Sequence, residues 1–154
     1  VGTGFKTLIG LFQSSTAANV TPYRIYDIVC GSSGGTPTDA DVDWELQRKD
    51  ATTAGTVGTA FSVAGTVAPL DSTTRAAGIA TATTVGGIDY SAEPTTYSTV
   101  LWHLSMNERA SYRWVAAPGS EFVAPATASL GVGLVAKSPA SYTSTVAATM
   151  LISE

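Results

Sequence analysis

The chain has 154 residues, enough for one domain that buries about two thirds of the surface of its unfolded chain. Charged residues make up 13%, and the eight Lys and Arg are scattered under a net charge of −4, which argues against a nucleic-acid partner. No stretch reaches the ~20 consecutive apolar residues of a membrane-spanning helix, so no membrane partner is expected. The single cysteine, Cys30, excludes an internal disulfide and a cysteine-built zinc site.

Apolar and polar residues alternate with a period of two along most of the chain, which predicts β-strands and no amphipathic helix. In chain order, the expected strands are 5–12, 23–30, 42–47, 56–64, 67–70, 77–85, 97–105, 111–117, 122–125, 131–137 and 145–153. Turn signals separate them, and the strongest is the cluster of Gly, Ser, Pro and Asp at 31–40.

Four expected strands carry more specific information. Strand 23–30 has apolar residues on both faces, which indicates a central position between two layers. Strand 42–47 alternates most cleanly and is expected to be half-buried. Strands 97–105 and 111–117 are separated by five residues that include Asn107, which predicts a hairpin.

Many short strands with a turn every 8–12 residues are typical of β-sandwiches and jelly rolls. We therefore expect an all-β, jelly-roll-like β-sandwich of about eight to ten short strands. Residues 1–21 are predicted to form an N-terminal strand or arm, because a polar connector follows them, and residues 22–154 form the sandwich domain. A further strand within the same sandwich explains residues 1–21 equally well.

Three motifs suggest chemistry, and each lacks a necessary part. Residues 31–35 match G-x-S-x-G, but a nucleophile elbow needs a helix after the serine, and a strand is expected there. Asp39, Asp41 and Asp43 have D-x-D spacing without the Gly and Glu that complete an EF-hand loop, so a weak ion site stays open. His103 has no second His or Cys with which to share a metal. We expect no catalytic residue, no metal site and no cofactor, and hence no enzyme.

Arginine and tryptophan are the residue types most enriched in interface hot spots. Arg109, Arg113 and Trp114 lie close together in a chain with few charges, so they are candidate contacts with another subunit. Alternation along strand 111–117 places Tyr112 and Trp114 on one face and Arg113 on the other. A surface pairing of Arg113 with a nearby acid is the competing interpretation.

The segment 110–128, ASYRWVAAPGSEFVAPATA, resembles a segment of small structural proteins of tailed bacteriophages. Residues 131–138 and 142–154 resemble the closing strands of those proteins, so that the similarity covers the last third of the chain. The resemblance implies a capsid decoration, or cement, protein of the jelly-roll type. Such a protein is a homotrimer that is made in the host cytoplasm and clamps the major capsid protein on the virion surface.

The sequence thus leads to a virion structural protein, with Phe5, Leu8 and Leu11 of the N-terminal arm as further apolar capsid contacts. No apolar h-region of a signal peptide is found near the N-terminus, which agrees with cytoplasmic synthesis. Two alternatives remain open. One is a trimeric receptor-binding or tail-fibre tip domain, and the other is an enzyme or a carbohydrate-binding module that uses Trp44, Trp102 and Trp114.

Overall fold

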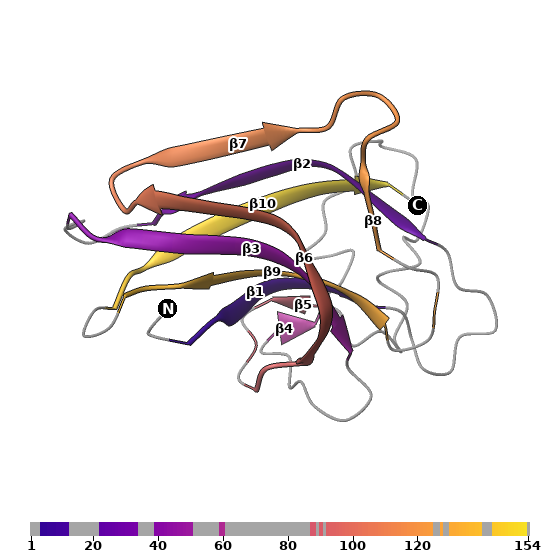
Figure 1. Cartoon of the computed structure of the whole chain (residues 1–154), viewed down its shortest axis with the longest axis horizontal. Helices are drawn as coiled ribbons and strands as arrows, with labels where there is room; N and C mark the ends of the chain where they lie inside the picture. The colour runs from indigo at the N-terminus through magenta and orange to yellow at the C-terminus, as the bar shows by residue number, and fades with distance from the viewer. Residues whose placement is uncertain are drawn as a thin grey trace.

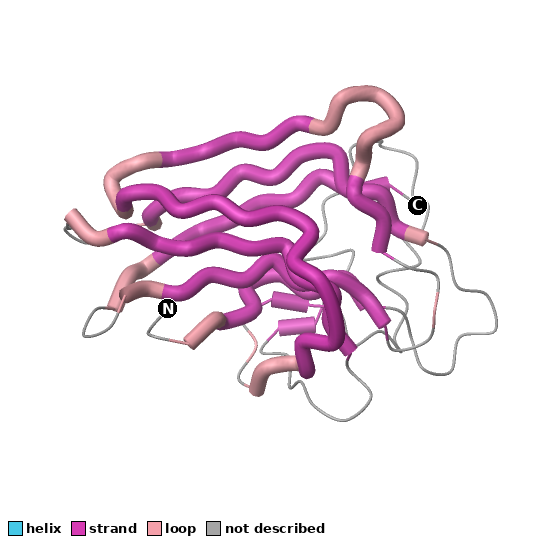
Figure 2. The backbone as a smooth tube through the Cα atoms, viewed as in Figure 1, coloured by secondary structure: helices cyan, strands magenta, loops and turns pink. Residues whose placement is uncertain are grey.

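The structure is a computed structural model, and it describes residues 4–12, 22–33, 39–50, 59–60, 87–88, 90, 92–124, 127, 130–139 and 143–153. Every regular element in these ranges is a β-strand, and Figure 2 shows the strands joined by loops and turns. No helix that is long and apolar enough to cross a membrane occurs in this part of the chain. The expected strands 67–70 and 77–85 lie outside the described residues.

The described strands run in chain order as Figure 1 labels them. They are β1 (Lys6–Phe12), β2 (Tyr23–Ser32), β3 (Asp41–Asp50), β4 (Thr59–Ala60), β5 (Gly87–Ile88), β6 (Thr95–Asn107), β7 (Ser111–Val115), β8 (Phe122–Ala124), β9 (Leu130–Lys137) and β10 (Val146–Ser153). Strand β4 lies within the expected strand 56–64, whose remaining residues are not described.

The strands form two antiparallel sheets. One is six-stranded, in the order β4-β5-β1-β9-β3-β6, and the other contains β10-β2-β7 with β8 also paired to β2. Apart from β4 and β5, neighbours in the six-stranded sheet are not consecutive in sequence, as in Greek-key sandwiches. The predicted all-β sandwich is therefore confirmed.

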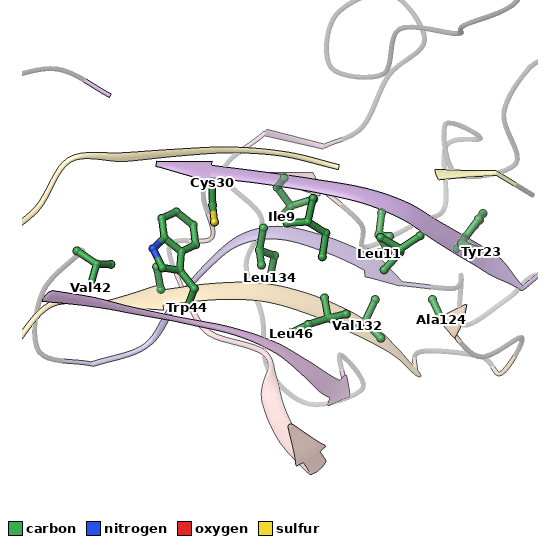
Figure 3. Close-up of a cluster of buried hydrophobic side chains, with 13 residues drawn as sticks. Ile9, Leu11, Tyr23, Cys30, Val42, Trp44, Leu46, Ala124, Val132 and Leu134 are labelled. Atoms are coloured by element: carbon green, nitrogen blue, oxygen red, sulfur yellow. The ribbon is translucent and has the colours of Figure 1, made fainter. Parts of the chain in front are cut away.

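The core lies between the two sheets and is formed by alternate residues of the central strands (Figure 3). Its members include Ile9, Leu11, Ile25, Ile28, Cys30, Val42, Trp44, Leu46, Val132 and Leu134. Trp44 and Leu46 are fully buried on β3, as the alternation of that strand predicts. Full burial of one such large apolar side chain contributes roughly 1.5–3 kcal/mol.

Strand β1 is an interior strand of the six-stranded sheet and lies between β5 and β9. Its register with β9 runs from Lys6↔Ala136 to Phe12↔Gly131, with one irregularity between Thr7 and Ile9. Residues 6–12 are thus part of the sandwich.

The predicted hairpin of β6 and β7 is wrong. Strand β6 pairs with β3 in one sheet, whereas β7 pairs with β2 in the other. The turn itself is formed, with the Ala110 amide bonded to the Asn107 carbonyl at 2.9 Å. Trp102 of β6 and Tyr112 of β7 stack with their centroids 6.1 Å apart, so that the rings fill the space between the two sheets. A period of two gives the buried face of a strand but not the sheet to which it belongs.

Candidate interaction surface

A sandwich has two outer faces, and they differ strongly in this protein. The outer face of the six-stranded sheet is buried over β1, β9 and the Gln47–Lys49 end of β3, and we call this part the covered face. Its residues Thr7, Phe12 and Val135 are 0% exposed, and Lys49 is 2% exposed. Tyr90 covers this face with its ring edge on Phe12, at a centroid distance of 6.1 Å.

A partly buried polar cluster at the covered face holds the segment that carries Tyr90, Glu93 and Pro94, which we call the covering segment. The Thr7 amide donates to the Glu93 carboxylate at 2.9 Å, and the Thr7 hydroxyl donates to the same group. Lys49 Nζ lies 4.0 Å from Glu93 Oε2 and 3.4 Å from the carbonyl oxygen of Pro94. Burial lowers the pKa of Lys49, while Glu93 and Glu45 act in the opposite direction.

Glycines on β1 and β9 make room for this cover. A Cβ atom at Gly10 would lie 2.5 Å from Tyr90 Oη. At Gly133 it would press on Lys49 Cγ at 3.2 Å and on Thr7 Cγ2 at 3.3 Å. The covered face is therefore closely packed and offers no surface to a partner.

The outer face of the four-stranded sheet is exposed, and we call it the open face. Two cross-strand rows lie side by side on it. One row is Thr149, Val29 and Arg113, and the other is Leu151, Asp27 and Val115. The open face also carries two exposed apolar side chains outside these rows, Tyr26 and Val123.

Apolar side chains are concentrated on the open face. Within the described residues, the large hydrophobic side chains that are exposed are Tyr26, Val29, Val100, Tyr112, Val115 and Val123. Four of these lie on the open face, and Val115 is 58% exposed. A clustered, exposed apolar patch with a polar rim is typical of a protein-binding surface, whereas scattered apolar residues are not.

An ion pair lies diagonally between the two rows. Arg113 Nε donates to Asp27 Oδ2 at 2.9 Å, and Arg113 Nη2 donates to the same oxygen. The Asp27 side chain is 7% exposed and the Arg113 side chain 64%, so that the carboxylate holds the guanidinium in place from below. The bond to Asp27 and its charge raise the pKa of Arg113. The pair is electrically neutral as a whole and leaves other guanidinium N–H groups directed at solvent.

A second ion pair lies at the end of the open face. Arg24 Nη1 is 3.8 Å from Glu121 Oε2. The Glu121 carboxylate also accepts the Gly119 amide at 3.0 Å. Hydrogen bonds from the backbone amides of Glu121 and Gly119, followed by the charge of Arg24, lower the pKa of Glu121. This end of the face therefore forms a polar rim.

The predicted arginine and tryptophan contacts are separated by the fold. Arg113 belongs to the open face. Trp114 lies on the opposite side of β7, as the alternation predicted, where its ring stacks on Phe122 at 4.6 Å and packs against the core. Arg109 forms an exposed pair with Asp39 at 2.9 Å, away from the two rows of the open face.

The three apolar residues assigned to an N-terminal arm are all engaged within the chain. Leu11 is 2% exposed in the core, so its assignment as an outward contact is wrong. Leu8 is partly buried and packs against the core. The Phe5 ring lies under Lys137 Nζ at 4.5 Å. Leu8 and Leu11 lie in the interior strand β1 and Phe5 directly precedes it, which accounts for this.

The residues of the chemical motifs do not converge in the described part of the chain. Ser33 follows β2 in the four-stranded sheet, whereas His103 lies on β6 of the other sheet, 4.0 Å from Asp43. Asp43 also pairs with Lys137 at 3.4 Å. No group of three or more His, Cys, Asp or Glu side chains among the described residues is placed to hold a metal ion.

Sequence reasoning missed the apolar residues of the open face. The signal was present in strand 23–30, whose strict alternation put Val29 on one face and Tyr26 on the other, and we interpreted the two apolar faces as burial between two layers. That interpretation is wrong for Tyr26 and Val29, because both side chains are exposed and both lie on the open face.

Comparison with protein-family models, with curated proteins and with solved structures finds no match for this chain.

Proposed function

We propose that this chain is a structural protein of a virion that binds the capsid exterior as a decoration protein. The observation that carries the binding role is the open face, on which Tyr26, Val29, Val115 and Val123 surround a neutral Arg113–Asp27 pair. Arginine held by an acid among apolar neighbours is a typical interface anchor. The assignment to a capsid rests on the resemblance of residues 110–128 to phage structural proteins.

In this proposal the partner is the major capsid protein, and the decoration protein acts as a homotrimer. Binding to the assembled lattice, and not to free capsid subunits, stabilises the lattice by mass action. No catalytic residue, metal or cofactor has a role in the proposed function.

The positions of the tryptophans favour this function over carbohydrate binding. A sugar-binding surface stacks its ligand on exposed aromatic rings. Trp44 is fully buried, while Trp102 stacks on Tyr112 and Trp114 stacks on Phe122. These rings are used in packing within the chain.

The test is binding of the purified protein to undecorated capsid shells, measured by cosedimentation and by the temperature at which the shells open. Val115→Lys on the open face should weaken binding at least tenfold, because it places an unpaired charge in an apolar contact. Val100→Lys is the matched control, since Val100 is an exposed valine of the other sheet, and it should bind like the wild type.

Thermal unfolding of both variants verifies that the fold is intact. Absence of wild-type binding to shells would exclude the decoration function. Binding that is lost equally in both variants would exclude the open face as the contact. Binding to host cells or to glycans instead would point to the receptor-binding or carbohydrate-binding alternatives.

A further inference from the structure

Strand β10 forms one edge of the four-stranded sheet. Its eight residues pair with β2 from Val146↔Ser32 to Ser153↔Arg24. Figure 1 shows β2 between β7 and β10, and within the described ranges no strand lies on the far side of β10. An edge strand of this kind presents a row of unpaired backbone N–H and C=O groups, to which another strand can add.

The other sheet edges carry features that discourage such pairing, and β10 does not. Strand β4 has only two residues. Strand β7 has five residues with Arg113 at its centre. Strand β6 shows two register shifts against β3, which bend it. Strand β10, VAATMLIS, contains no charged residue and no proline, and its one irregularity lies near its end, between Leu151 and Ile152.

We propose that the occupant of this edge is β10 of a second copy of the chain, paired antiparallel about a twofold axis at Thr149. Directly opposed residues in an antiparallel pair share a face of the sheet. Thr149 then faces Thr149 of the partner subunit, and threonine pairs are favourable across strands. Because the strand is uncharged, self-pairing places no like charges opposite each other.

The side-chain volumes support this register. With the axis at Thr149, Ala147 lies opposite Leu151 of the partner subunit on the outer face. On the inner face, Ala148 lies opposite Met150 of the partner subunit. Each small side chain thus faces a large one. An axis at Ala148 would instead place alanine opposite alanine and leave a gap.

The pairing joins the two four-stranded sheets into one continuous sheet across the dimer. The open faces of the two copies then lie side by side, because Leu151 of β10 continues the row of Asp27 and Val115. This inference depends only on the strand edge and goes beyond the proposed capsid function. Where the proposed homotrimer also forms, its three β10 edges pair with three further copies, which gives a hexamer when these copies belong to one second trimer.

The experiment measures the mass of the full chain by sedimentation equilibrium and by native mass spectrometry across a range of concentrations. The wild type should form even-numbered assemblies. Thr149 is exposed, so Thr149→Lys and Thr149→Glu should fold normally, and each should weaken the pairing at least tenfold by placing like charges at the axis. An equimolar mixture of the two variants should restore the pairing, since opposite charges then face each other.

Val115→Lys is the control that separates this inference from the proposed function. It should lose shell binding and keep the twofold pairing, because Val115 lies on β7 at the far side of the sheet. A second measurement uses Thr149→Cys, which should form an intermolecular disulfide under oxidation, while Val115→Cys should not.

A monomeric wild type overturns the proposal. The proposal is also overturned if Thr149→Lys leaves the mass of the assembly unchanged. It is overturned as well if the mixture of the lysine and glutamate variants fails to pair. If the charged variants do not fold, the disulfide of Thr149→Cys decides: its formation supports the pairing, and its absence overturns it.

Discussion

The covered face and the open face of this sandwich both carry apolar side chains, but these side chains differ in their exposure to solvent. On the covered face, Phe12 and Val135 are 0% exposed, and the ring of Tyr90 lies against Phe12. On the open face, Val115 is 58% exposed, although it too is a strand valine on the outside of a sheet. The chain itself buries the part of one outer face over β1 and β9, and it leaves the apolar open face accessible.

The difference in exposure follows from the residues that each face carries. The covered face has glycines at 10, 131 and 133, which let side chains and backbone approach closely. The open face has Val29 on its central strand β2, with the Arg113–Asp27 pair joining β2 and β7 beside it. A face whose glycines allow close approach is filled from within the chain, whereas an exposed apolar face with an arginine held by an acid is suited to another protein.

The largest effect is expected from Gly131→Ala on the covered face. The added Cβ would overlap the carbonyl oxygen of Leu11 and crowd Phe12, and a backbone atom in the β1–β9 pairing cannot move aside cheaply. We expect a loss of about 3 kcal/mol or more in the free energy of unfolding, measured by urea denaturation. Gly4→Ala is the control, since nothing lies within 4 Å of a Cβ there. Equal stability of the two variants would contradict the close packing of the covered face.

The most direct comparison of the faces uses two matched substitutions. Val135→Ala should cost about 2 kcal/mol of unfolding free energy, because Val135 is fully buried and the smaller side chain leaves a cavity. Val115→Ala should change it by less than about 0.5 kcal/mol, since its side chain is mostly in water. Denaturation of both variants in parallel measures the difference. If Val115→Ala were as costly as Val135→Ala, the open face would be covered by the chain.

The sequence was sufficient for the class of fold and for the inner faces of the strands. The alternation of Val42, Trp44 and Leu46 correctly gave their burial, and the alternation of Arg113 and Trp114 correctly placed them on opposite sides of β7. These results depend only on the local geometry of a strand.

What the sequence did not reveal depends on contacts between distant segments. The position of Leu11 in an interior strand follows from pairing with β9, and the covered face follows from contacts of Tyr90 and Glu93 with β1. Likewise, two apolar faces on β2 indicate either burial or a binding surface. Only the arrangement of the sheets separates these two meanings.

The pH dependence of the unfolding free energy tests whether the sheet behind the open face keeps solvent away from the core. Cys30 is on the inner side of β2 and 1% exposed, and burial raises the pKa of its thiol from 9.0 to about 11. The unfolded chain therefore loses this proton first, so that the stability is fully present below pH 9 and falls as the pH rises toward 11. We expect a loss of about 1 kcal/mol between pH 9 and pH 10. Cys30→Ala should remove this part of the pH dependence, and an unchanged slope in that variant would show that solvent reaches the thiol.

The smallest effect is expected at Arg109, and its comparison with Arg113 sharpens the definition of the open face. Arg109 pairs with Asp39, whose side chain is 81% exposed, so Arg109→Ala should change the unfolding free energy by less than about 0.5 kcal/mol. Arg113→Ala should be clearly more destabilising, because it leaves the carboxylate of Asp27 buried without its cation.

The double variant Asp27→Asn with Arg113→Ala should recover part of that loss, since no buried charge remains. Urea midpoints of the four proteins, wild type included, measure these differences. Equal effects at both arginines would mean that the Arg113–Asp27 pair is an ordinary surface pair, and the open face would then lose the anchor that distinguishes it from a merely apolar sheet.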